Sequence, residues 1–293
     1  MSMSELLLDL KKEALENTRK RLEQRTLSGK LTEVEIHGKI HRLRRYDCGK
    51  AKAPVYFDIH GGGFCWGMME EGDRFCQRVC EKLGYQVYAL DYPLTPENRY
   101  PSALYWLYDT IQYLVEHAEE FCIDPEQMLV GGRSAGGNLS AALCLLAKQR
   151  QEFQFAGQIL DHPYLDACGI IPDEERYLGP EALTLELMEL LASTYASLEE
   201  RKESLCSPLK ASDEELRNLP PAVIQTCELD SLRPDGDRYA KRLGENGVEV
   251  IAHCYPLVPH SFTEVDGPEE ERGQQWLMDG MQTIIDKKQH KSI

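Results

Sequence analysis

The chain has 293 residues, long enough to bury a large core within a single domain. Its hydrophobic fraction of 42% is typical of a soluble globular protein, and no apolar run approaches the ~20 residues that span a bilayer. The formal net charge of −16, from 33 basic and 49 acidic side chains, disfavours nucleic acid and anionic membranes as partners, because both repel an acidic surface.

The ten cysteines are scattered through the chain without a C-x-x-C pair. We expect no secretory leader, since Leu6-Leu7-Leu8 is a short apolar run and charged residues follow it at once. Reduced thiols and a cytoplasmic location are therefore expected. Cys76 and Cys80 are expected to pack in the core, and the lack of ligand-spaced Cys/His pairs predicts no metal ion or other cofactor.

The first part of the chain predicts a helix followed by a hairpin. Residues 4–26 combine charged side chains with spaced leucines, as in an amphipathic helix. Two alternating runs, residues 33–36 and 40–44, are separated by His37-Gly38, which favours a turn between two antiparallel strands.

From residue 54 onward, short apolar runs alternate with helix-forming stretches. This alternation predicts an α/β fold with a mostly parallel, eight-stranded sheet and helices on both faces. In such sheets, reactive groups gather beyond the carboxyl ends of the strands. Strands are predicted at 55–59, 86–90, 128–131, 157–160, 222–227 and 248–255, and helices at 73–83, 102–118, 138–148, 234–244 and 269–286.

Residues 170–205 interrupt this alternation with acidic, helix-forming sequence that contains no predicted strand. We expect an insertion that covers the active edge of the sheet together with the N-terminal helix. The predicted organisation is one domain over residues 1–293, with a helical cap from about 1–30 and 165–205. We find no repeats or interdomain linkers.

The segment Gly132-Arg133-Ser134-Ala135-Gly136 has the form G-x-S-x-G and lies between a predicted strand and a predicted helix. In that setting a serine is held in a strained turn with its hydroxyl exposed above the sheet. The pattern alone is weak, because roughly one chain in ten of this length would contain it by chance. The other parts of a serine hydrolase must therefore be found.

A glycine-rich loop, His60-Gly61-Gly62-Gly63-Phe64, follows the strand at 55–59. Consecutive glycines leave backbone N–H groups free to converge on an anion, such as the oxyanion of an acyl-transfer reaction. Phosphate binding is an alternative, but neither glycine-rich phosphate motif is present. A plain turn is the simplest alternative, and His60 is expected to brace the loop.

A serine nucleophile needs a histidine base, which follows it in the chain order of this fold type. Three histidines lie between Ser134 and the C-terminal tail. His162 comes too early in that order, and His253 is expected to be buried within a strand. His260 follows the last predicted strand by a short loop, which is where a base is expected.

The base in turn needs an orienting carboxylate. Asp230 lies three residues beyond the strand that ends at Cys227, and it is the best placed candidate. Glu228 and Asp235 are the alternatives.

These motifs together resemble the hormone-sensitive-lipase-like group of α/β-hydrolases, bacterial carboxylesterases with a helical cap. The resemblance covers roughly residues 50–285. It is carried by HGGGF at 60–64, DYPLTPE at 91–97, Tyr100-Pro101, SAGGN at 134–138, SPL at 207–209, ELDSLRPD at 228–235 and HSF at 260–262.

The resemblance implies that Ser134 is the nucleophile, Asp230 the orienting acid and His260 the base. It further implies an oxyanion hole formed by Gly61, Gly62 and the N–H of Ala135. The implied activity is hydrolysis of short-chain carboxylic esters, with a small-molecule ester as the binding partner. The alternatives are a deacetylase, an amide or formamide hydrolase, and an inactive ligand-binding receptor.

Two positions depart from the family pattern. Arg133 replaces the usual Asp before the nucleophile, and we expect either a rebuilt surface ion pair or a preference for acidic substrates. Ser261 replaces the usual Gly after the base, with little expected effect.

Four aromatic residues are expected to line the substrate pocket, with core packing as the alternative for each. They are Phe64, Trp66, Tyr164 and Tyr195. The oligomeric state is open between a monomer and a homodimer.

Overall fold

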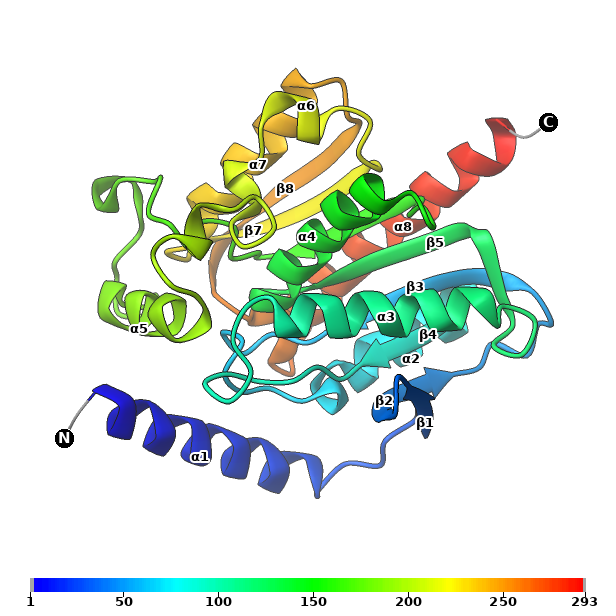
Figure 1. Ribbon diagram of the computed structural model, residues 1–293, viewed down its shortest axis with the longest axis horizontal. Helices are drawn as coiled ribbons and strands as arrows, with labels where there is room; N and C mark the ends of the chain where they lie inside the picture. Colours follow the sequence, from blue (N-terminus) through cyan, green and yellow to red (C-terminus); the bar gives the residue numbers. More distant parts are fainter. Residues whose placement is uncertain (1–2, 292–293) are drawn as a thin grey trace.

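The computed structural model describes residues 3–291, whose strands form one eight-stranded sheet (Figure 1). The strand order is β1-β2-β4-β3-β5-β6-β7-β8. The strands from β3 to β8 are parallel, whereas β2 pairs antiparallel with both β1 and β4. The predicted α/β class is confirmed. The strands are β1 (Lys30–Ile36), β2 (Lys39–Tyr46), β3 (Ala53–Ile59), β4 (Gln86–Leu90), β5 (Ile123–Arg133), β6 (Gly157–Asp161), β7 (Ala222–Leu229) and β8 (Val250–Pro259).

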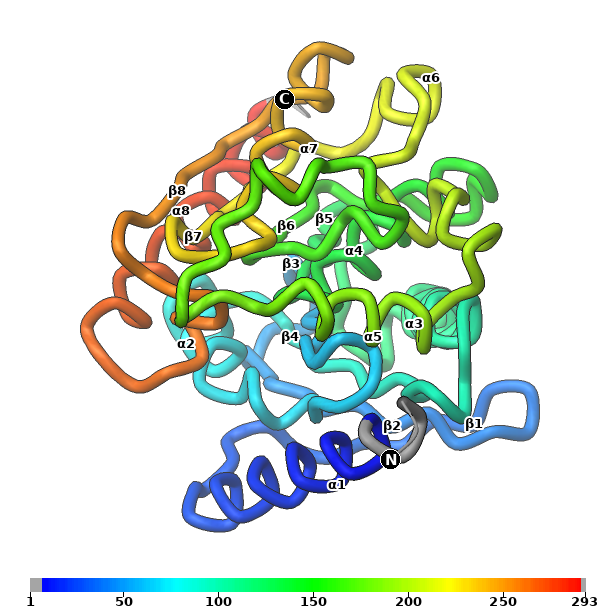
Figure 2. The backbone as a smooth tube through the Cα atoms, turned by 90° about the vertical axis from the view of Figure 1, so that its left-hand side faces the viewer, coloured from blue at the N-terminus to red at the C-terminus, as the bar shows by residue number. Residues whose placement is uncertain are grey.

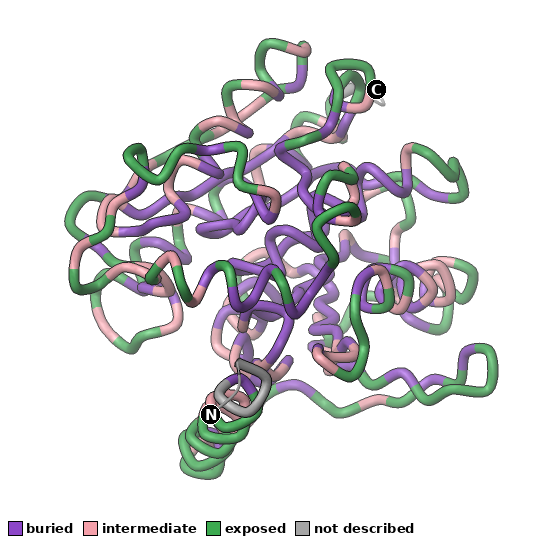
Figure 3. Tube along the Cα trace, turned by 60° about the vertical axis from the view of Figure 1, so that its left-hand side comes forward, coloured by how far each residue is buried: buried purple, intermediate pink, exposed green. Residues whose placement is uncertain are grey.

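Helices cover both faces of the sheet, because successive side chains of a strand point to opposite faces. On β3, Val55, Phe57 and Ile59 are buried in a cluster with α3, α4 and α7, whereas Tyr56 is buried in a cluster with α2 and α8. Figure 3 shows the buried backbone that results in the middle of the molecule. The helices are α1 (Met3–Leu22), α2 (Asp73–Leu83), α3 (Ser102–Glu116), α4 (Ala135–Arg150), α5 (Leu185–Tyr195), α6 (Asp213–Leu216), α7 (Arg233–Glu245) and α8 (Pro268–Lys291).

Some elements differ in extent from the predictions. Helix α1 ends at Leu22 rather than near residue 26, and beyond it the backbone N–H groups of Ser28 and Gly29 donate to the Asp73 carboxylate. Helix α4 begins at Ala135, because the chain passes directly from the strand through one turn residue into the helix. Helix α8 continues to Lys291, since no glycine or proline follows the predicted end to stop it.

The prediction that His253 is buried is wrong. Strand β8 is one of the two edge strands of the sheet, and His253 is exposed on it. An edge strand has a neighbour on only one side, so helices α7 and α8 cover it incompletely. The prediction that Cys76 and Cys80 pack in the core is confirmed, since both are buried in the cluster between the sheet, α2 and α8.

The start of α1 and helix α5 lie at the same end of the molecule, at the left of Figure 1 and facing the viewer in Figure 2. Leu7 of α1 packs with Leu190 and Leu191 of α5 and with Cys65 of the glycine-rich loop region. These contacts support the assignment of both segments to a cap, which stays a prediction. None of the helices within residues 3–291 combines the length and apolarity needed to traverse a bilayer.

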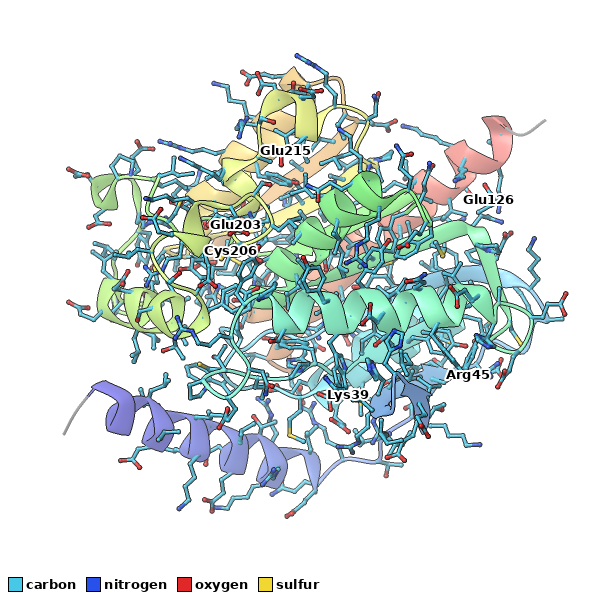
Figure 4. All side chains as sticks on the ribbon, in the orientation of Figure 1. Lys39, Arg45, Glu126, Glu203, Cys206 and Glu215 are labelled. Carbon is cyan, nitrogen blue, oxygen red and sulfur yellow. The ribbon has the colours of Figure 1, made fainter. Side chains whose placement is uncertain are left out.

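The segment between α5 and α6 is tied to the core. Glu203 and Cys206, labelled in Figure 4, mark its position. The Tyr100 hydroxyl donates to Glu203 at 2.7 Å, and the Asn138 side-chain amide donates to the Cys206 carbonyl at 3.0 Å. Because Asn138 lies on α4, this segment is anchored beside the serine turn.

Candidate active site

Ser134 is the single residue of the turn between β5 and α4. Its backbone has φ 53° and ψ −115°, a conformation that a residue with a side chain rarely adopts. Hydrogen bonds hold it there: its N–H donates to the Asp161 carbonyl at 3.0 Å, and its carbonyl accepts from Tyr164 N–H at 3.1 Å. The strained turn that the G-x-S-x-G pattern predicts is therefore present.

The two glycines of the pattern are required by close packing against β3. A Cβ added to either Gly132 or Gly136 would overlap the carbonyl oxygen of Ile59. Only glycine fits at both positions, so the pattern is a structural requirement of this turn.

His260 and Asp230 form a hydrogen-bonded pair beyond the ends of β8 and β7. The distance between His260 Nδ1 and Asp230 Oδ2 is 2.8 Å. Asp230 is fully buried, and its other oxygen accepts from Leu232 N–H at 2.9 Å. Burial by itself raises the pKa of Asp230, but the charge and hydrogen bond of His260 and the Leu232 N–H lower it, so the pKa lies below its usual value.

The two alternative acids are engaged elsewhere. Glu228 accepts from Leu257 N–H, whereas Asp235 accepts from Arg176 and from the backbone N–H groups of Leu165 and Asp166. Asp230 is thus the carboxylate that the fold brings to His260.

The glycine-rich loop lies beside Ser134. The position of a Cβ on Gly61 would be 3.6 Å from Ser134 Cβ. His60 stacks on Tyr92 at 4.1 Å between ring centroids, and the Tyr92 hydroxyl donates to the His60 carbonyl at 3.1 Å. Burial lowers the pKa of His60 to about 4, which supports a bracing role for a neutral ring. Gly62 has φ 100° and no room for a Cβ beside the Trp66 carbonyl.

A cavity of about 210 Å³ contains these groups. Ser134, His260 and the three loop glycines line it on one side. Helix α5 and the residues just before it supply an apolar wall of Leu183, Leu187, Met188 and Leu191, completed by Leu232.

The four predicted aromatic residues divide into two pairs. Trp66 and Tyr164 line the cavity. Phe64 and Tyr195 do not; they are buried and stack on each other at 3.7 Å between ring centroids, with an interplanar angle of 4°. For these two, the structure corresponds to the core-packing alternative.

The family model for the alpha/beta hydrolase fold matches residues 56–264. The chain belongs to this alpha/beta hydrolase family. The hydrolase is 31% identical over 242 residues to the ethyl acetate hydrolase of Pseudomonas putida, covering 82% of this chain and 75% of that enzyme. It is 32% identical over 245 residues to the arylesterase of Saccharolobus solfataricus, covering 82% and 77%.

Solved structures of esterases share the fold of this chain. The carboxylesterase EstE1 from a metagenomic library superposes with a TM-score of 0.89 at 26% identity, covering 97% of the hydrolase and 99% of EstE1. Some homologues are longer: the hydrolase spans 57% of an alpha/beta hydrolase homologue from Acanthamoeba polyphaga mimivirus. The predicted resemblance to hormone-sensitive-lipase-like esterases is confirmed.

Arg133 of the hydrolase forms a buried ion-pair cluster. Its guanidinium donates to both oxygens of Asp58, at 2.9 and 3.1 Å, and to Glu264 at 3.0 Å. Burial opposes the charge of Arg133, but Asp58 and Glu264 raise its pKa well above the usual value. The prediction of a surface ion pair at Arg133 is thus wrong. The ion pair is buried, with 6% of the Arg133 side chain and none of the Asp58 side chain exposed.

Sequence reasoning did not identify two carboxylates in the cavity wall of the hydrolase, Glu71 and Glu264. Glu264 is held by Arg133, and Glu71 accepts from Arg21 of α1 at 2.5 Å. A signal for Glu264 exists in the sequence, because it lies one helical turn after His260. For metal ions, residues 3–291 contain no group of three or more His, Cys, Asp or Glu side chains placed to hold one.

Proposed function

We propose that this ester hydrolase is a serine carboxylesterase that cleaves short-chain carboxylic esters through an acyl-enzyme intermediate. The observation that carries the proposal is the convergence of a strained Ser134 and the His260–Asp230 pair in one cavity. The names of its homologues, which include an ethyl acetate hydrolase and an arylesterase, support the ester as the substrate class.

In the proposed mechanism His260 removes the proton of the Ser134 hydroxyl as the oxygen attacks the ester carbonyl. Gly61, Gly62 and Ala135 N–H groups stabilise the oxyanion, a contribution of about 3–4 kcal/mol for one such donor. His260 then protonates the leaving alcohol. A water molecule activated by His260 releases the acid from Ser134.

The cavity volume supports small substrates. The cavity is bounded, with a volume of about 210 Å³, and its apolar wall suits the short alkyl group of a small acyl chain. A panel of p-nitrophenyl esters from acetate to decanoate, with matching anilides, tests the proposal. We expect the highest kcat/KM for acetate to butyrate, and faster turnover of the anilides would contradict an esterase.

Fluorophosphonate labelling separates the enzyme from a ligand-binding receptor, whose Ser134 would be inert.

The activity should depend on pH through His260, because the base acts only when unprotonated. Burial by itself lowers the pKa of His260, but the Asp230 carboxylate and its hydrogen bond raise it more, so the pKa lies above the usual 6.5. We therefore expect kcat/KM to fall on acidification with a midpoint above pH 6.5. The Asp230→Asn variant should have a lower midpoint, and a wild-type midpoint below pH 6.5 would contradict this account.

Esters that carry a carboxylate should be poor substrates. Glu71 and Glu264 line the cavity, whereas Arg133 is engaged by two carboxylates and does not line it. We expect kcat/KM for a succinate monoester to be roughly tenfold below that for the neutral butyrate ester, because like charges that share one partly desolvated cavity repel each other by on the order of 1 kcal/mol.

Two variants check this selectivity. Glu71→Gln should narrow the ratio between the neutral and the anionic ester. Glu249→Gln, an exposed glutamate paired with Lys287 before β8, should leave the ratio unchanged. If the wild type instead prefers the succinate monoester, the result would support the other expectation for Arg133, namely that the enzyme prefers acidic substrates. The cytoplasmic location and the homodimer stay predictions.

A further inference from the structure

The residue beside the base that the mechanism does not use is His162. It follows β6 and is buried, with 1% of its surface exposed. Its ring lies against the His260 ring, with 4.5 Å between centroids and an interplanar angle of 66°. We propose, on the basis of the proposed function, that His162 is a positioning residue that holds the His260 ring toward Ser134.

The hydrogen bonds around His162 determine which nitrogen of its ring carries a hydrogen. The Thr263 hydroxyl donates its one hydrogen to Asp161 at 2.6 Å. The Thr263 oxygen can therefore only accept from His162 Nε2, which is 3.4 Å away. His162 Nδ1 has no hydrogen-bond partner within the described residues. This inventory assigns a neutral ring with the hydrogen on Nε2.

The charged groups around His162 come from four elements. Asp161 precedes it on β6, Asp230 follows β7, His260 follows β8, and Glu264 lies in the turn after the base. Burial lowers the pKa of His162, the charge of His260 lowers it further, and the three carboxylates oppose this. Because His162 stays neutral, the positive charge formed during the reaction resides on His260 alone.

The location of His162 explains why the base needs it. The side chain of His260 makes one hydrogen bond to a described side chain, through Nδ1 to Asp230, which leaves the ring able to tilt about that contact. The His162 ring blocks this tilt. The adjacent Asp161 carbonyl accepts the N–H of Ser134 at 3.0 Å. One dipeptide therefore contacts the backbone of the nucleophile and the ring of the base.

The hydrogen bonds of this dipeptide keep it rigid. The His162 N–H donates to the Gln225 carbonyl at 2.7 Å, and the Gln225 side-chain amide donates to Asp161 at 2.8 Å. Thr263, which also binds Asp161, lies three residues after His260. The same cluster thus connects β6, β7 and the loop that carries the base.

Two variants separate the ring from the hydrogen bonds. His162 has φ 37°, a left-handed conformation that asparagine tolerates well. His162→Asn keeps this backbone and an N–H donor but removes the ring. His162→Phe keeps a ring and removes the donor. His253→Asn, at an exposed histidine of β8, is the matched control.

We expect His162→Asn to lower kcat by roughly 10- to 100-fold with KM within about twofold, because misplacing a reacting group by ~1 Å costs about 10²-fold. The rate of Ser134 labelling by a fluorophosphonate should fall equally, and the downfield proton resonance of the His260–Asp230 hydrogen bond should broaden. His162→Phe should recover a large part of kcat, and the control should match the wild type.

Wild-type kcat in a folded His162→Asn variant would overturn the proposal. Equal losses in the Asn and Phe variants would also overturn it, since they would assign the effect to the hydrogen bonds and not to the ring. Thermal unfolding verifies that each variant is folded. A wild-type protein that does not react with the fluorophosphonate would instead refute the proposed serine mechanism itself, so the two failures are distinguishable.

Discussion

The Ser134→Ala variant is expected to lose roughly 10⁴- to 10⁶-fold in kcat/KM toward p-nitrophenyl acetate. The substitution removes the nucleophile, whereas the glycine-rich loop and the cavity remain and supply a small residual rate. Alanine lacks the hydroxyl, but it accepts the same backbone conformation as serine. The unfolding temperature should therefore stay close to that of the wild type, as measured by circular dichroism.

Ser193→Ala is the matched control, because Ser193 is an exposed serine on α5 that does not line the cavity. It should hydrolyse the ester at the wild-type rate. Full activity in Ser134→Ala would mean that another group attacks the ester, and the assignment of the nucleophile would then be wrong.

The largest expected effect on stability is that of Arg133→Met. Asp58 is fully buried and receives two hydrogen bonds from Arg133. Removing the guanidinium leaves this carboxylate without a cationic partner there, and its remaining donors include only neutral groups such as the Tyr56 hydroxyl, which donates at 3.1 Å, and the Cys76 thiol. Breaking a buried pair in this way costs about 3–5 kcal/mol, a large part of a typical unfolding free energy of 5–15 kcal/mol. Urea unfolding at pH 7 measures it.

Two further variants test the cause. Arg233→Met breaks an exposed pair with Asp237 on one helix and should cost less than about 1 kcal/mol. The double variant Asp58→Asn/Arg133→Met should be more stable than Arg133→Met alone, because the fully buried residue 58 then carries no unpaired charge. A loss below about 1 kcal/mol in Arg133→Met would show that Asp58 finds compensation elsewhere.

The predictable parts of the fold are those that depend on local pattern. The strand at 55–59 and the helix at 73–83 have clear apolar periodicity, and the structure contains both. The pairing of Asp230 with His260, beside the cavity that Ser134 lines, could be predicted from the chain order typical of this fold. The carboxyl ends of parallel strands meet at one edge, so residues far apart in the sequence converge there.

The unpredicted parts depend on contacts between distant segments. Asp58 and Arg133 are 75 residues apart, and nothing local indicates that they pair. A charged residue in each of two apolar strands is, in retrospect, the available signal, because a buried charge needs a partner. The stacking of Phe64 on Tyr195 and the exposure of His253 likewise depend on which segment covers which, and local pattern does not encode this.

The contact between His162 and His260 belongs to the same class. The chain order predicts that His162 comes too early to be the base, and in the structure it is His260 that pairs with Asp230. Its place beside the base arises because β6 ends next to the serine turn, where Asp161 binds Ser134.

The central claim, covalent catalysis by Ser134, is tested most directly by mass spectrometry after reaction with a fluorophosphonate. We predict one phosphonyl group per chain, on the peptide that contains Ser134, and a loss of esterase activity in proportion to labelling. Preincubation with the ester substrate should slow the reaction. Full inactivation with Ser134 unmodified, or complete labelling of Ser134 with full activity, would contradict the account.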